Sequence, residues 1–326
     1  MQNRRSFHPT ATLSLAIAIL LWATIPLFLR SFIHEIDGWT ANGSRYGFAA
    51  MLWIIPLIVF MKRGMVDRKL FYYAIIPSIV NIIAQTFWAW TVYYLEPGMV
   101  MFLSRLSLVF TVLASFALFP DERALIRSPY FWMGILFLVM GFIGMNIMRG
   151  NLSADESWMG LFIIIGNAIF LGLYGVSVRC WMRGVKPWIS FPIICIYTAT
   201  GLIILMIMFG DPSDLLDMQP HRIVVLIISS IVGIALAHVF IYYAIEHLGV
   251  SISSGCQLVL PFMTTIGSYF IYGEIFSIGQ WICGIGLLFG AALLLMAQRH
   301  LGEPADPVPV CEVPEIEEFT SSFKKE

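Results

Sequence analysis

The chain has 326 residues, of which 59% are hydrophobic and only 12% are charged, and its formal net charge is −1. A soluble domain carries about a quarter charged residues, because its surface must stay hydrated. The composition therefore indicates a surface covered mainly by lipid. The near-neutral charge argues against nucleic-acid binding, which needs a basic surface patch.

Ten apolar segments are long enough to cross a membrane. A helix rises about 1.5 Å per residue, so about 20 apolar residues span a hydrocarbon core roughly 30 Å thick. In chain order the predicted spans are 13–33, 39–61, 70–93, 98–119, 130–148, 158–178, 188–209, 222–243, 250–272 and 277–297. Short breaks at 96–98 and 246–249 separate span 3 from span 4 and span 8 from span 9. The expected fold class is an all-α membrane protein with ten transmembrane helices.

Lysine and arginine gather in the loops on one side of the predicted bundle. Cytoplasmic loops of membrane proteins carry an excess of these residues. Only Arg149 and Arg222 fall in the opposite loops. The favoured side holds Arg4, Arg5, Lys62, Arg63, Arg68, Lys69, Arg123, Arg127, Arg179, Arg183, Lys186 and Arg299. We therefore expect a multi-pass protein of the cytoplasmic (inner) membrane with both termini in the cytoplasm.

The two halves of the sequence match each other at nearly constant offsets. Glu122, just after span 4, lies 152 residues before Glu274, just after span 9. Further matched pairs are Trp132 with Trp281, Gly141 with Gly290, Leu106 with Leu258, Leu108 with Leu260 and Phe110 with Phe262. Because five spans is an odd number, the second half must enter the membrane from the opposite side. Inverted repeats of this kind place a substrate site at the repeat interface near the bilayer midplane.

A family resemblance follows from the second half in particular. The stretches 242–249 (YYAIEHLG) and 257–262 (QLVLPF), then Gly273-Glu274, Gln280 and Gly284, resemble the EamA-type repeat of the drug/metabolite transporter superfamily. Trp22 and Arg45 also stand where that repeat commonly has these residue types, and the resemblance covers about 13–297. In the first half, Val109 stands opposite Pro261. The resemblance implies a ten-span secondary transporter, commonly an exporter of amino acids or other metabolites.

Five segments make up the expected organisation of the chain. They are a cytoplasmic N-terminal segment (1–12), a first five-helix EamA-like repeat (13–148), an extracytoplasmic linker (149–157), a second repeat (158–298) and a cytoplasmic tail (299–326). The tail is rich in proline and acidic residues, a composition that cannot bury enough apolar surface to fold. We expect the tail to be disordered.

Arg105 is the most unusual residue within the predicted spans. It lies eight residues after Pro97, about 12 Å into span 4 by helical rise. A charge at the centre of a bilayer costs roughly 2.5–3.5 kcal/mol. No acidic residue is found at a comparable depth. A guanidinium group binds carboxylate or phosphate through two hydrogen bonds, which favours a substrate-binding role. The alternative is a structural arginine that bonds backbone carbonyls or reaches the interface.

Other candidates for substrate binding come from polar and aromatic stripes. Asn81, Gln85 and Trp88 share one face of span 3, at spacings i, i+4 and i+7. Hydrogen bonding between helices is the alternative for such a stripe. Gln257 takes the place of Arg105 in the second repeat. The full set of expected substrate-binding residues is Arg105, Asn81, Gln85, Trp88, Trp22, Gln257, Tyr242, Arg45 and Tyr174.

Span 8 carries a second stripe, formed by His238, Tyr242 and Glu246 at i, i+4 and i+8. A histidine titrates near neutral pH, which makes His238 a candidate for proton coupling, together with Glu246. A neutral, hydrogen-bonded ring is the alternative. If His238 couples protons to transport, His238→Gln will remove the pH dependence of flux, and an unchanged pH profile would contradict this role.

The sequence contains no hydrolase motif, no metal-ligand spacing and no phosphate-binding loop. We therefore expect a protein that is not an enzyme and uses no catalytic residues, metal or cofactor. The favoured hypothesis is a secondary transporter that exports a small polar metabolite, such as an amino acid, by alternating access. Its expected partners are a small-molecule solute and the lipid bilayer, and we expect a monomer or homodimer. The alternatives are a membrane-embedded enzyme and a non-transporting sensor or scaffold with the same fold.

Overall fold

A computed structural model describes residues 8–149 and 154–299, and within these residues all regular structure is helical. The helices of the first half are α1 (Pro9–Ala23), α2 (Ile25–Ser31), α3 (Gly38–Lys62), α4 (Arg68–Tyr73), α5 (Ile75–Tyr94), α6 (Pro97–Leu103), α7 (Ser107–Leu118) and α8 (Pro129–Ile147). Those of the second half are α9 (Ala154–Trp181), α10 (Pro187–Phe209), α11 (Asp214–Asp217), α12 (Pro220–Ser230), α13 (Ala237–Leu248), α14 (Val250–Cys256), α15 (Leu260–Tyr272) and α16 (Ile278–Arg299). The prediction of a disordered tail lies outside the described residues, apart from Arg299. Most of the expected N-terminal segment and part of the linker lie outside them too.

Nine of the predicted spans are helices, or runs of consecutive helices, long and apolar enough to cross a membrane in the part of the chain that the structure describes. The remaining predicted span, 250–272, consists of α14, a 3-10 turn and α15. The two expected breaks are also present. Pro97 begins α6, a position where its missing N–H costs nothing, and Gly249 has the positive φ of 85° that glycine adopts without strain. The all-α membrane fold is therefore confirmed.

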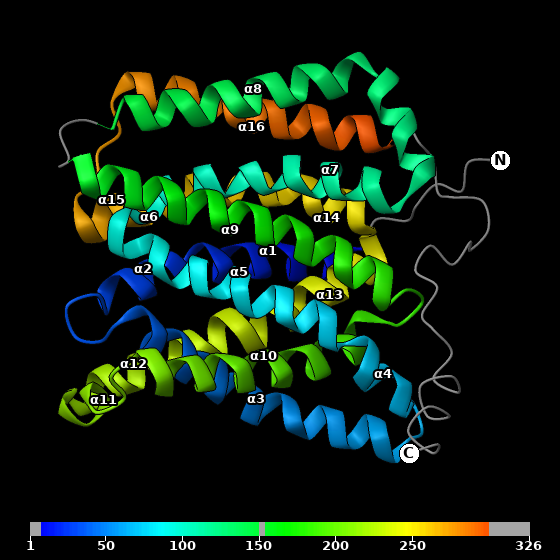
Figure 1. Ribbon diagram of the computed structural model, residues 1–326, viewed down its shortest axis with the longest axis vertical. Coiled ribbons are helices and arrows are strands. Elements are labelled where there is room, and N and C mark those ends of the chain that lie inside the picture. Colours follow the sequence, from blue (N-terminus) through cyan, green and yellow to red (C-terminus); the bar gives the residue numbers. More distant parts are fainter. Residues whose placement is uncertain (1–7, 150–153, 300–326) are drawn as a thin grey trace, which may run out of the picture.

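The helices of the two halves pack in pairs across the repeats. α8 lies along α16 at one side of the molecule, and α3 lies along α10 at the other (Figure 1). These pairs join spans 5 and 10 and spans 2 and 7. α1 packs on α13, α5 on α9, and α6 on α15. Spans 1 and 6 are equivalent in the two repeats, and so are spans 3 and 8. The contact between spans 1 and 8 therefore has its symmetric counterpart in the contact between spans 6 and 3.

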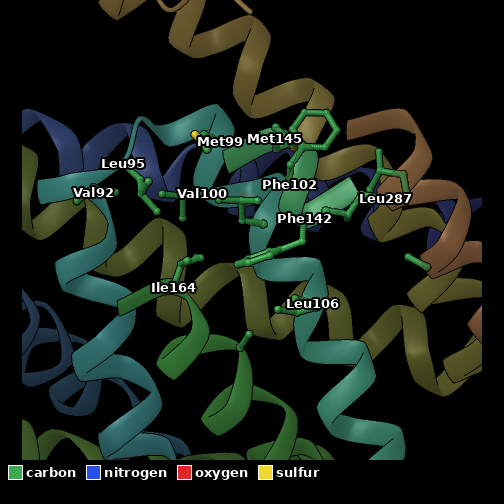
Figure 2. Close-up of a cluster of buried hydrophobic side chains, with 14 of the residues drawn as sticks. Val92, Leu95, Met99, Val100, Phe102, Leu106, Phe142, Met145, Ile164 and Leu287 are labelled. Carbon is green, nitrogen blue, oxygen red and sulfur yellow. The ribbon is translucent and has the colours of Figure 1, made fainter. Parts of the chain in front are cut away.

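A core of apolar side chains fills the space between α5, α6, α8, α9 and α16 (Figure 2). Phe102 of α6 is fully buried there, and its ring lies 5.6 Å from that of Phe262 and 5.8 Å from that of Phe276, measured between centroids. The outer helices instead expose large apolar side chains, such as Phe270 and Ile278. An apolar exterior is the expected surface of a protein in a bilayer.

The contact between α8 and α16 depends on glycine. A Cβ added at Gly290 would lie 2.6 Å from the backbone nitrogen of Leu138 and 2.7 Å from the carbonyl oxygen of Gly134. A Cβ added at Gly286 would meet nothing closer than Phe137, at 4.0 Å. Small residues at such positions allow the backbones of membrane helices to approach closely.

Replacement of Gly290 by valine should therefore destabilise the protein. Backbone atoms cannot rotate away as a side chain can, so we expect Gly290→Val to lower the free energy of unfolding by about 1–3 kcal/mol or more. Gly286→Ala should leave it unchanged and serves as the control. Thermal unfolding of the purified variants measures the effect, and equal midpoints for the two would contradict this packing.

Candidate functional site

A cavity of about 310 Å³ lies at the interface between the two repeats. Its wall is built from spans 1 to 4 of the first repeat and spans 6, 8 and 9 of the second. The lining residues are Trp22, Ile25, Arg45, Tyr46, Gln85, Trp88, Met101, Ser104, Arg105, Ser107, Asn167, Leu171, Tyr174, Gly233, Ile234, His238, Gln257 and Leu260. Eight of the residues predicted from the sequence are among them: Trp22, Arg45, Gln85, Trp88, Arg105, Tyr174, His238 and Gln257.

The helices depart from α geometry where they meet the cavity. Span 4 narrows to a 3-10 turn at Ser104–Leu106, which contains Arg105, and span 9 does the same at Gln257–Val259. Arg105 and Gln257 are 152 residues apart, so the two turns are equivalent in the repeats. Span 4 makes its turn without the proline of span 9. A third irregular segment, the π-helix Ile231–Leu236, interrupts span 8 beside the cavity. Such mid-helix irregularities are frequent at functional sites.

Arg45 of α3 is almost fully buried and is held by α12. Its Nε donates to the hydroxyl of Ser229 at 3.0 Å, and an Nη donates to the Ser229 carbonyl at 3.5 Å. The Ser230 hydroxyl in turn donates to the carbonyl of Arg45. These bonds fix the direction of the guanidinium group, and they involve no carboxylate.

Arg105 has no comparable support. Its Nε is buried without a hydrogen-bond partner, and among the described residues no hydrogen bond or ion pair to its guanidinium group is found. Three ion pairs are described: Arg179 with Glu122, Lys186 with Glu246 and Arg222 with Glu35. All three lie at the ends of helices, away from the cavity wall.

Span 3 presents only part of its predicted stripe to the cavity. Gln85 and Trp88 line the wall, whereas Asn81 does not. The Asn81 amide donates to the Thr198 hydroxyl at 3.0 Å and accepts from the Gln85 amide at 3.4 Å. Asn81 thus links α5 to α10 and holds the side chain of Gln85, which lines the cavity.

Span 8 contributes an aromatic side of the cavity. His238 lines the wall, and its Nδ1 lies 2.9 Å from the carbonyl oxygen of Ile234. Its ring stacks on Phe191, with 4.0 Å between centroids, and meets Trp22 edge-on at 5.4 Å. Tyr242 lies outside the lining, edge-on to His238 at 5.7 Å. The imidazole is therefore surrounded by rings, without a nearby carboxylate among the described residues.

Glu246 lies about two helical turns beyond His238, at the exposed end of α13. Its carboxylate bonds Lys186 at 3.3 Å and the Trp188 indole N–H at 3.1 Å. The structure thus places the two candidates for proton coupling apart, with only His238 at the cavity.

Several lining residues were not recognised from the sequence. Tyr46 and Ser104 carried no signal of their own, and the support of Arg45 by Ser229 joins residues 184 positions apart. Asn167 differs, because its polar side chain within span 6 makes it a weaker cavity candidate from the sequence. It is buried, with its amide nitrogen bonded to the Ala84 carbonyl at 3.2 Å and its side-chain oxygen without a partner. Polar atoms facing a cavity in this way are groups that a ligand can bind.

The two ends of the cavity differ. At the end where α6 begins, called the α6 end here, all residues of α6 are buried. The Glu274 carboxylate accepts from the backbone N–H of Gly98 at 2.9 Å and of Met99 at 3.1 Å. This carboxylate of the second repeat thus caps a helix of the first, where it also complements the helix dipole. Burial raises the pKa of Glu274 above its usual range.

At the opposite end, where α14 begins (the α14 end), the equivalent contact is absent from the described residues. Val250, at the position equivalent to Gly98, is 64% exposed, and Ile252 is 40% exposed. Glu122, the counterpart of Glu274, pairs with Arg179. The α6 end is therefore covered by α15 and Glu274, whereas no such cover of α14 is found in the part of the chain that the structure describes.

The inverted five-helix repeats around a polar central cavity define a class of integral membrane proteins in which the solute site lies between the halves. The chain belongs to the EamA-like transporter family, whose sequence profile matches residues 10–147 and 158–296. These two matches coincide with the two repeats. The EamA family is part of the drug/metabolite transporter superfamily.

Two further proteins are similar to this chain. A protein described as an uncharacterized transporter of Haemophilus influenzae is 25% identical over 181 residues, which cover 54% of this chain and 59% of that protein. The match thus spans less than two thirds of the relative's length. A protein of solved crystal structure superposes with a TM-score of 0.57 at 20% identity, covering 89% of this chain and 98% of its own. At that identity the likeness concerns the fold alone.

Proposed function

We propose that this protein is a secondary transporter that exports a small polar metabolite, such as an amino acid, across the cytoplasmic membrane by alternating access. The observation that carries the proposal is the central cavity, which receives polar groups from both repeats at the points where spans 4, 8 and 9 leave α geometry. Membership of a transporter family supports it. The units that would move against each other are the repeats 13–148 and 158–298.

The unequal ends support alternating access. The lysine and arginine bias supports an orientation with both termini, and with them the α14 end, on the cytoplasmic side. The covered α6 end then faces outward. In such a state the cavity is loaded from the cytoplasm, as an exporter requires. The change of access would release Gly98 and Met99 from Glu274 and cover the N-terminus of α14.

Counterflow in proteoliposomes tests the proposed function. Vesicles containing the purified protein are loaded with a mixture of unlabelled amino acids and small organic acids, and the uptake of each labelled solute is followed. We expect saturable uptake of at least one solute, accelerated by the internal pool. Uptake equal to that of protein-free vesicles for every solute would contradict transport and favour the sensor, scaffold or enzyme alternatives.

A further inference from the structure

The wall of the central cavity carries two guanidinium groups and no carboxylate. Arg45 and Arg105 both line it, whereas none of its described lining residues is aspartate or glutamate. Arginine keeps its proton in proteins, so both side chains are cationic. The cavity therefore holds an uncompensated positive charge of two within the membrane-spanning part of the fold.

Structural arginines of this chain behave differently. Arg30 donates to the carbonyl oxygen of Val92 at 2.5 Å, and Arg149 donates to the carbonyl oxygen of Tyr94. Both complete the C-terminal end of α5, as arginines near helix ends commonly do. Arg105 bonds no carbonyl among the described residues, and its Nε is buried and unsatisfied. A structural role therefore does not account for Arg105.

The positive charge of the cavity and its surroundings indicate which kind of ligand would bind there. Attraction between opposite charges is much stronger in a low-dielectric site than in water, and a buried cation without a partner is unfavourable. A carboxylate or phosphate matches the planar fork of arginine. The same cavity is also lined by apolar side chains, among them Trp22, Trp88 and Leu260, which pack in one cluster with Met101. A volume of about 310 Å³ is at the lower limit of ligand pockets, which suits a small solute.

We propose that the cavity binds a small organic anion, with its carboxylate on Arg105 and its apolar body against Trp22 and Trp88. Arg45, fixed by Ser229, adds positive potential to the same cavity. The assignment rests on the proposed function and narrows its solute to anions. Amino acids with no net charge are then poorer solutes than organic acids of the same size, because their ammonium group meets no acidic partner on the described wall.

Three probes of nearly equal size separate charge from shape: phenylacetate, its neutral amide phenylacetamide, and the cation phenethylamine. A ligand that binds the folded state raises the melting temperature by mass action. We expect a saturable rise with phenylacetate and none with the other two. An equal or larger rise with the amide or the amine, or no rise with phenylacetate, would overturn the proposal.

Variants locate the binding group. Arg105→Gln should weaken phenylacetate binding at least about tenfold, because a hydrogen-bonded charge is lost. Arg105→Lys, which keeps the charge without the fork, should bind with intermediate affinity. The exposed Arg63 gives the matched control, Arg63→Gln, with unchanged affinity. If Arg105→Gln does not fold, the phenylacetate affinity of Arg105→Lys is compared with that of the wild type, and a weaker affinity supports the role of Arg105. Equal affinity in all the folded variants would overturn the role of Arg105.

Counterflow separates this proposal from the one on which it rests. Flux of neutral or cationic solutes, with no organic anion transported, would overturn the anion site while leaving the transporter intact. Absence of flux for solutes of every charge would overturn the proposed function itself. Flux of organic anions that Arg105→Gln reduces, and that Arg63→Gln does not, supports both.

Discussion

Gly98→Val is expected to abolish transport. A Cβ at this position would lie 2.6 Å from the Thr265 hydroxyl oxygen and 2.8 Å from Oε2 of Glu274. Real Cβ atoms do not approach so closely, so the larger side chain must either displace the Glu274 carboxylate from the N-terminus of α6 or push α6 away from α15. The α6 end could then no longer close, and a transporter that cannot close one end cannot complete its cycle. Counterflow in proteoliposomes measures the loss.

The second repeat explains why this substitution is informative. The Gly98→Val substitution gives α6 the residue type that α14 has at the equivalent position, Val250. Among the described residues, α14 lacks the close contacts that cover α6. Gly175→Val is the matched control, because a Cβ added at Gly175 meets no atom within 4 Å. We expect the control to keep wild-type flux. Full flux in Gly98→Val, or an equal loss in both variants, would contradict closure of the α6 end.

Glu274→Ala is expected to open the α6 end about tenfold more often. The substitution leaves the buried N–H groups of Gly98 and Met99 without an acceptor, which costs about 1–3 kcal/mol. A cysteine at position 99, in a variant whose own five cysteines are replaced, reports the opening. Met99 is only 3% exposed, so an impermeant maleimide should label that cysteine slowly in the parent and much faster with Glu274→Ala.

A neighbouring glutamate provides the control for this experiment. Glu96 precedes α6 directly, but its exposed side chain makes no capping hydrogen bond. Glu96→Ala removes the same negative charge from the same helix end and should leave labelling at position 99 unchanged. Equal acceleration by both substitutions would show that charge, and not the Glu274 hydrogen bonds, keeps the end closed.

The spans and the inversion of the two repeats could be predicted from the sequence because the bilayer imposes them. Apolar length identifies a span, and an odd number of spans per repeat requires inversion. Arg105 could be singled out for the same reason. A charge at that depth in the bilayer is costly, so such residues are rare and are usually found at functional sites. The equivalence of Arg105 and Gln257 also followed from the repeat offset, and both residues line the cavity.

Helical spacing alone could not resolve the finer features of the site. It predicts which residues share a face, but not which neighbour that face meets. Asn81 shares its face with Gln85 and Trp88, yet its amide bonds Thr198 of α10. The π-helix at Ile231–Leu236 and the contact of Arg45 with Ser229 depend on tertiary packing between distant segments. No local pattern in the sequence encodes them.

The reciprocity of the two ends is the most direct test of alternating access. Single cysteines at positions 99 and 250 report on the α6 end and the α14 end, each with and without Gly98→Val. If the ends alternate, Gly98→Val will speed maleimide labelling at position 99 and slow it at position 250, although the substitution touches only the α6 end. Faster labelling at 99 with no change, or a rise, at 250 would contradict alternating access and leave only a local distortion of α6.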